Sequence, residues 1–372
     1  GYRTDVRVCN LSYLQTDWYV NQMKSQAYES DPLPISMEEL QYGNKKREYA
    51  YILDRVDYPV SVKMAMDYFL SDDERTKTIP GYGKINHLPT GELFIDIDKE
   101  KILKSGIVPK GYEDKIVDRI DLSFKDKNTL ILNDLAIIDL LSTNAETGWK
   151  RPVYFATTVD PSFFTETDKY FMRTGMAYEV VPVKLENTPG RYQVNTDKMY
   201  DNVMNKFVWG GIDVNPDIYL DETIRRMCYS YRIMFIDLID QLIQEGKTDK
   251  ALKALDYCME KIPGDVVPHN YISLQLAMDY YFLKQNEKGK ALLEKIADSA
   301  IEYVTWINSL DNNKKRSVQR DYYYNERALA EQAIPMFYRF GDEESGKKYL
   351  EKAALAGVDI NRYFKIDTSK TN

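Results

Sequence analysis

The most restrictive feature of the sequence is a change of pattern near Asn215-Pro216. Before this point short apolar runs alternate with amphipathic stretches and many Pro and Gly residues, whereas after it a helical period continues to about residue 357. We therefore expect an α/β (or α+β) domain over residues 1–215, followed by an all-α domain over residues 216–372.

A short pattern recurs within the helical part. A Gly or Asn ends one helix, and a small residue follows five positions later in the next helix. The three copies start at Gly246, Asn286 and Gly341, and their small residues are Ala251, Ala291 and Gly346. Gly and Asn tolerate the left-handed backbone of a helix end, and small residues let two antiparallel helices approach closely. The pattern predicts three helical hairpins.

The first copy resembles the tetratricopeptide repeat. Phe235, Leu238, Ile239 and Leu242 occupy its first-helix core positions, and Pro263 occupies the closing turn. The copies start about 40 and about 55 residues apart, not the usual 34, and an insert at residues 311–316 accounts for the longer gap. The resemblance implies stacked hairpins whose concave face binds a peptide or protein. The alternative is that these helices only pack against the first domain.

The first part of the chain mixes strand and helix patterns. Strands are expected at residues 6–11, 93–98, 120–124, 153–158 and 178–185. Helices are expected at residues 17–28 (capped by Thr16), 60–70, 99–105 and 133–142 (capped by Asn133). The glycines between residues 81 and 91 lack the spacing of a phosphate-binding loop, and we interpret them as turns.

Composition excludes several classes of function. A net charge of −8 and a pI near 5.2 argue against nucleic acid and against an anionic membrane surface. The sequence has only three cysteines (Cys9, Cys228 and Cys258) and two histidines, all without metal-ligand spacing. We expect no metal and no cofactor, and we expect Cys228 and Cys258 to be buried free thiols.

One candidate ligand-binding cluster is Asp17, Trp18 and Tyr19. It lies where the first predicted strand passes into the first predicted helix. The carboxyl ends of strands are the usual ligand side of an α/β sheet, and a helix N-terminus there favours anionic groups. The alternative is that Trp18 is simply a core aromatic residue.

The other candidates are Asp96, Trp149 and Arg151. Asp96 alternates with apolar residues on a predicted strand, as at a ligand-facing edge, although a solvent-facing strand gives the same pattern. An exposed Trp149 beside Arg151 would stack on a sugar or hold a phosphate, unless Arg151 is an ordinary surface residue. No residue forms a recognisable catalytic motif, so we assign no catalytic residue.

Three segments together resemble a known family. They are residues 5–20 (DVRVCNLSYLQTDWYV), 129–137 (TLILNDLAI) and 149–156 (WKRPVYFA). The chain looks like the C-terminal soluble region of bacterial multi-pass membrane proteins similar to protein O-mannosyltransferases, which use polyprenyl-phosphate sugars. In such enzymes the membrane helices and their loops supply the catalytic acids and the donor site, so the resemblance transfers no catalytic residue to this sequence.

The resemblance implies a periplasmic, non-catalytic domain that binds or positions an acceptor protein or peptide beside its own membrane-embedded N-terminal region. The chain starts without Met or signal peptide, in a period-two pattern at Val6 and Val8, so we expect a piece of a longer protein or a processed form. Two alternatives stay open. One is a stand-alone tetratricopeptide scaffold, and the other is a soluble carbohydrate-active enzyme with a site between the two domains.

Overall fold

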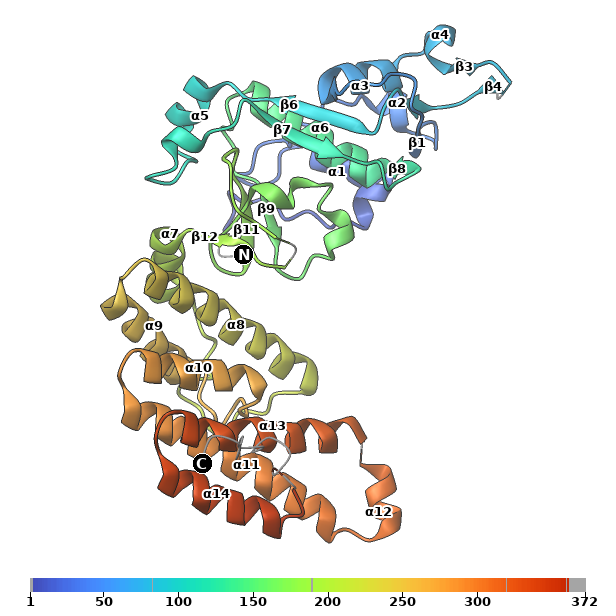
Figure 1. Ribbon diagram of the computed structural model, residues 1–372. Coiled ribbons are helices and arrows are strands. Elements are labelled where there is room, and N and C mark those ends of the chain that lie inside the picture. Colours follow the sequence, from blue (N-terminus) through green and yellow to red (C-terminus); the bar gives the residue numbers. More distant parts are fainter. Residues whose placement is uncertain (1–2, 82, 189, 319, 359, 361–372) are drawn as a thin grey trace, which may run out of the picture. The chain divides into compact units, whose positions relative to one another are not determined.

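The chain folds as two compact units, Gly1–Asn195 and Thr196–Asn372. The computed structural model describes residues 3–81, 83–188, 190–318, 320–358 and 360 (Figure 1). The division falls before the break expected at residue 215, because helix α7 (Thr196–Asp201) belongs with the helical unit. Thr196 donates from its hydroxyl to Glu245 at 2.9 Å, and Lys250 lies over the ring of Tyr200.

The described residues of the first unit form helices α1 to α6 and four small sheets. The helices are α1 (Asp17–Met23), α2 (Glu39–Tyr42), α3 (Val62–Leu70), α4 (Glu74–Lys77), α5 (Lys99–Ser105) and α6 (Leu132–Glu146). The strands are β1 (Tyr49–Ile52), β2 (Val60–Ser61), β3 (Thr78–Ile79), β4 (Gly83–Lys84), β5 (His87–Leu88), β6 (Glu92–Asp96), β7 (Arg119–Ser123), β8 (Thr129–Ile131), β9 (Tyr154–Ala156), β10 (Phe171–Arg173), β11 (Ala177–Val180) and β12 (Gln193–Val194).

The sheets have the orders β5-β1-β8, β2-β6-β7, β12-β10-β11-β9 and β3-β4. β5 runs parallel to β1, β2 to β6 and β12 to β10, and the other pairs are antiparallel. The unit is therefore a mixed α/β structure, as the sequence predicts.

Helix α6 is the centre of the first unit's core. It is buried on almost every side and packs against α3 and β6. Its one acid at mid-helix, Asp139, accepts hydrogen bonds from the backbone amide (2.6 Å) and hydroxyl (2.5 Å) of Ser36. A buried carboxylate needs such donors, so Asp139 ties the segment before α2 to the core.

Most of the predicted elements are confirmed, but the first strand is wrong. Residues 6–11 form no strand, and Val6 and Val8 are exposed. Arg7 in this segment donates from its side chain to the backbone carbonyls of Gln22 and Ser25, so the segment is held by α1 instead of a neighbouring strand. The helix expected over residues 17–28 ends at Met23.

Smaller corrections concern caps and strand ends. Thr16 does not cap α1, because its hydroxyl donates to the carbonyl of Tyr13 at 2.7 Å. Asn133 lies inside α6, which starts one residue earlier. The strand expected over residues 178–185 ends at Val180, two residues before Pro182, and proline has no amide to donate to a ladder.

The second unit is helical throughout its described part, as predicted. After α7 and a π-helical turn (Asn202–Lys206) come α8 (Glu222–Gln244), α9 (Thr248–Lys261), α10 (Tyr271–Phe282), α11 (Asn286–Ser309), α12 (Asn312–Ser317), α13 (Arg320–Arg339) and α14 (Glu343–Leu355). α8 packs against α9, α10 against α11, and α13 against α14 (Figure 1). The insert expected at residues 311–316 is the short helix α12.

The three hairpins share one turn geometry. Gly246, Lys284 and Gly341 have positive φ angles of 73°, 60° and 82°. The amide that follows each of them donates at 2.8 Å to the carbonyl five residues earlier, at Leu242, Tyr280 or Phe337. This hydrogen bond closes the preceding helix in the pattern known as the Schellman motif.

The register predicted for the middle hairpin is wrong by two residues. Asn286 starts α11 instead of ending α10, and Ala291 is exposed. The left-handed residue is Lys284, and the small buried residue five positions later is Gly289. Ala251 and Gly346 are buried at the corresponding positions of the other two hairpins, as predicted.

A buried arginine connects the first two hairpins. Arg232 of α8 donates to the carbonyls of Ile262 (3.1 Å), Val267 (2.5 Å) and Pro268 (2.9 Å), after the end of α9. Burial lowers the pKa of Arg232, but these carbonyls stabilise its charge. Cys228 and Cys258 are free and buried, as predicted.

Candidate functional site

The predicted cluster at residues 17–19 lies at the start of α1, and its three side chains have different surroundings. The carboxylate of Asp17 accepts hydrogen bonds from the amides of Trp18 (2.8 Å) and Asn44 (3.1 Å). Tyr19 is buried, and its hydroxyl accepts a hydrogen bond from the amide of Asn10 at 2.9 Å. Trp18 is the member that faces solvent. A carboxylate already occupies this helix start, so the expectation of an anionic ligand there has no support.

Trp18 belongs to a group of packed aromatic rings. The ring centroids of Tyr13, Trp18 and Tyr19 lie 5.4–5.9 Å apart. Tyr13 is 52% and Trp18 is 55% exposed. Two half-exposed rings are thus held in place by a third, buried one.

A second exposed aromatic group lies on strand β1. Tyr49 and Tyr51 point to the solvent side of the sheet, with their ring centroids 5.4 Å apart, while Ala50 between them is buried. Ile131 of β8 is directly opposite Tyr49 in the sheet and is also exposed. Alternate residues of a strand face opposite sides, so this pattern is a half-buried strand that exposes its aromatic side.

Gln15 connects the two groups. Its side chain donates to the carbonyl of Glu48 at 3.5 Å and accepts from the amide of Asn133 at 3.3 Å, so it lies beside the starts of both β1 and α6. Figure 1 places β1, β8 and α1 at the same end of the unit. We call the exposed set the aromatic surface; it consists of Tyr13, Trp18, Tyr49, Tyr51 and Ile131.

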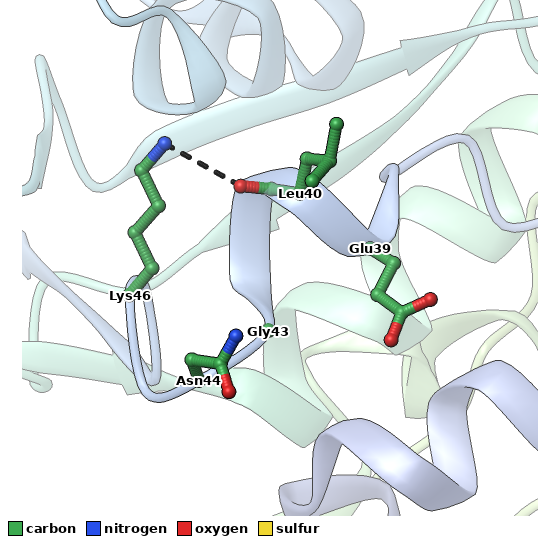
Figure 2. A pocket seen from close by; sticks show the side chains of 5 residues that line it. All are labelled: Glu39, Leu40, Gly43, Asn44 and Lys46. Carbon is green, nitrogen blue, oxygen red and sulfur yellow. Dashed lines mark hydrogen bonds between the residues drawn. The ribbon is translucent and has the colours of Figure 1, made fainter.

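A pocket of about 450 Å³ lies next to Asp17. It is lined by Glu39, Leu40, Gly43, Asn44 and Lys46 (Figure 2). The amide of Asn44 donates to Asp17, which precedes Trp18, so the pocket and the aromatic surface adjoin at the start of α1. Asn44 and the next residue, Lys45, have positive φ angles of 53° and 62°, which turn the chain sharply around the pocket.

The pocket loop is anchored by its neighbour Arg47. This buried guanidinium donates to the carbonyls of Gln41 (2.7 Å) and Ser71 (3.1 Å) and to the carboxylate of Asp72 (2.6 Å). Lys46 also pairs with Asp72 at 3.1 Å. Hydrogen bonds from Arg47 and then Lys46 lower the pKa of Asp72. The loop is therefore fastened to the end of α3, where Lys46 and Arg47 share the carboxylate of Asp72.

Trp149 and Arg151 have structural roles: Trp149 is buried, and Arg151 donates hydrogen bonds to a neighbouring segment. Trp149 is 1% exposed and follows α6 in a turn with a φ of 56°, so its ring cannot stack on a ligand. Arg151 donates to the carbonyls of Asp31 (2.7 Å) and Pro32 (3.3 Å) and to the hydroxyl of Ser30 (2.5 Å). These contacts hold residues 30–32 to the end of α6.

Asp96 lies on a different sheet. It is exposed at the end of β6, opposite Arg119 of β7. Arg119 pairs instead with Asp121 at 2.7 Å. Asp98, two residues on, accepts from the amide of Lys101 and caps α5. Asp96 therefore lies on the solvent-facing side of its strand, which is the alternative to a ligand-facing edge.

The sequence therefore predicted one residue of the aromatic surface, Trp18, and the preceding residue Asp17, which accepts a hydrogen bond from the pocket residue Asn44. It missed the pocket and the strand Tyr49–Ile52, whose alternation of tyrosines with Ala50 is the signal that was available. Among the residues that the structure describes, no group of three or more His, Cys, Asp or Glu side chains is placed to hold a metal ion. No helix in the same residues is both long and apolar enough to cross a bilayer.

The helical unit has an exposed surface of its own. On α10, Tyr271 and Phe282 are 69% and 67% exposed, and their spacing of eleven residues places them on one side of the helix. Ile233 of α8 is exposed at the position that corresponds to Tyr271 when the hairpins are aligned on Ala251 and Gly289. First helices of the first two hairpins thus expose a large apolar side chain at one matching position, Ile233 and Tyr271.

These observations define a class of protein, in which a mixed α/β unit carries an aromatic surface and precedes a unit of helical hairpins. The model of the family TMEM260-associated domain 2 matches residues 1–198, just over half of the 372 residues. The chain therefore belongs to this family. Neither the curated proteins nor the solved structures include a match to the chain.

Proposed function

We propose that the chain is a non-catalytic, extracytoplasmic domain of a protein O-mannosyltransferase-like membrane protein, in which it holds the acceptor polypeptide. The family match links the first unit to a membrane protein of the TMEM260 type. The resemblance of residues 5–20, 129–137 and 149–156 to O-mannosyltransferase-like proteins supports the same context. The periplasmic location is part of this proposal.

The observation that carries the acceptor-binding role is the exposed side of α10. Large apolar side chains on a solvated helix face are unfavourable unless a partner covers them, and a row of them suits an extended polypeptide. We infer that the three hairpins stack in the manner of tetratricopeptide repeats, so that first helices face the bound chain. The common turn geometry and the buried small residue in each hairpin support this arrangement.

The test is binding of an unmodified acceptor polypeptide to the 372-residue chain. We expect weak binding that Tyr271→Ala and Phe282→Ala each reduce several-fold. Leu355→Ala is the matched control, because Leu355 is a large exposed apolar residue on the second helix of its hairpin. Unchanged binding in both α10 variants would refute the role of this surface.

A second measurement separates the proposal from its alternatives. We expect the isolated chain to show no transfer from a polyprenyl-phosphate sugar, whereas membranes that contain the full-length protein transfer sugar and lose activity with Phe282→Ala. Turnover by the isolated chain would favour a soluble carbohydrate-active enzyme. Acceptor binding without any effect of the variants on transfer would favour a scaffold.

A further inference from the structure

We propose that the aromatic surface and the adjoining pocket of the first unit bind a neutral carbohydrate. This site lies in a different unit from the acceptor-binding helices, so the inference goes beyond the proposed function and does not depend on it. Three features of the site carry it: the exposed rings, the free polar groups of the pocket and the balance of charge.

The exposed rings provide the stacking face. Tyr13 and Trp18 are held edge to face against the buried Tyr19, and Tyr49 and Tyr51 support each other on β1. Their positions are fixed before a ligand arrives, which limits the entropy lost on binding. An aromatic face attracts ligands that present C–H groups on one side and polar groups at the edge, as a pyranose ring does.

The pocket provides matching polar groups. Within the described residues, the carboxylate of Glu39 and the side-chain amide of Asn44 make no hydrogen bond. A carboxylate accepts hydrogen bonds, and an amide both donates and accepts them, so the pair can satisfy hydroxyl groups that do both. The volume of about 450 Å³ is in the range of small-ligand sites, which are commonly a few hundred cubic ångströms.

The charges at the pocket sum to zero and favour no ionic ligand, because Lys46 and Arg47 share the carboxylate of Asp72 and Glu39 supplies the second negative charge. The lining residues include one cation, Lys46, and its ammonium is paired with Asp72 at 3.1 Å and donates to the carbonyl of Leu40 (Figure 2). The neighbouring Arg47 is occupied by carbonyls and by the same carboxylate. Glu39 would repel a phosphate or carboxylate ligand. A neutral, hydroxyl-rich ligand fits this lining.

The experiment uses the 372-residue chain and four neutral probes: the methyl α-glycosides of glucose, galactose and mannose, and maltose. Saturation-transfer NMR reports contact with the protein, and tryptophan fluorescence reports binding at Trp18. We expect at least one probe to bind with an affinity on the order of millimolar. Trp18→Ala should weaken it about tenfold, the effect of losing one good aromatic contact.

Two further variants define the site. Glu39→Ala, at an exposed position, should also weaken binding, which keeps the test valid if Trp18→Ala perturbs folding. Trp306→Ala is the matched control: Trp306 is 49% exposed but lies on α11 of the helical unit. Binding of the sugar should be unchanged in this variant.

Three outcomes would overturn the inference: no neutral sugar binds, glucose 6-phosphate binds better than the neutral probes, or both Trp18→Ala and Glu39→Ala bind the sugar as the parent does. If an apolar dye bound but no sugar did, the inference would be refuted, and the result would indicate a protein-docking surface. The acceptor-binding test uses other residues and a polypeptide probe. Failure of the sugar-binding proposal can therefore be distinguished from failure of the acceptor-binding proposal.

Discussion

The substitution Gly289→Ala tests the close packing of the middle hairpin. A Cβ atom at Gly289 would lie 2.7 Å from Cδ2 and 2.8 Å from Cε2 of Tyr281, closer than carbon atoms normally approach. Tyr281 cannot easily move away, because its ring stacks on Phe340, the residue after α13, with centroids 3.9 Å apart and planes 7° from parallel. We expect the crowding to cost about 1–3 kcal/mol.

A second effect of this substitution has the opposite sign. Alanine favours a helix interior over glycine by about 1 kcal/mol. The net change in the parent protein should therefore be a loss of about 0–2 kcal/mol in the free energy of unfolding. Removal of the clash with Tyr281→Ala should reverse the sign, so that Gly289→Ala stabilises the Tyr281→Ala variant by about 1 kcal/mol.

The assay is urea unfolding of the four proteins of this double-mutant cycle, followed by helical circular dichroism. The expected coupling energy between positions 281 and 289 is about 1–3 kcal/mol. If Gly289→Ala changed the stability equally in both backgrounds, the contact between α10 and α11 would not be limited by the glycine, and the reasoning would fail.

Three further predictions concern the same unit. Ala251→Leu should lower the free energy of unfolding by about 1–3 kcal/mol in urea denaturation, since Ala251 is fully buried between α8 and α9; no loss of stability would contradict the hairpin register. Arg232→Met should cost about 1–3 kcal/mol by the same assay, because buried carbonyls lose their donors, and a neutral result would mean that water replaces the guanidinium. Asp279 is 3% exposed, and burial together with the charge of Asp240 raises its pKa to about 7. Between the ordinary pKa of an aspartic acid and pH 7, the folded state therefore keeps a proton on Asp279 that the unfolded state has released, so Asp279 destabilises the fold as the pH rises towards 7. Asp279→Asn should become more stabilising relative to the parent between pH 4 and pH 7. A difference in unfolding free energy that does not change with pH in urea titrations would refute this.

A second group, His269, contributes to the pH dependence of stability with the opposite sign to Asp279. Burial and the charge of Arg232 lower the pKa of His269 to about 3. The unfolded chain binds the proton first as pH falls, so His269 reduces stability below its ordinary pKa of about 6.5. This effect overlaps the window of Asp279 and offsets it.

The sequence predicted element types well where periodicity was long. The described chain from α8 to α14 is helical, as the helical period indicates, and α5 has the bounds that the sequence predicts. The failure at residues 6–11 has a physical cause, because alternation alone does not supply the neighbouring strand that a β-strand needs. That segment is held instead by side-chain hydrogen bonds from Arg7, to Tyr19 and from Asn133, which no local pattern reveals.

Two other failures come from residues in uncommon conformations. Lys284 adopts the left-handed backbone that glycine usually takes, so no glycine at this position indicates the turn of the middle hairpin in the sequence. Trp149 also has a positive φ, and this turn carries its ring into the core instead of solvent. The pocket could not be predicted because its walls depend on the distant anchors Asp17 and Asp72, which approach residues 39–46 only in the folded unit.

The position of α12 has a practical consequence. This short helix links α11 to α13, and it interrupts neither the hairpin before it nor the turn of the hairpin after it. Doubling the length of a flexible connection costs only about 0.6 kcal/mol in closure entropy. Residues 311–316 are therefore the place where an affinity tag, a fluorophore or an extra domain can be inserted into the chain with the hairpins on both sides kept whole.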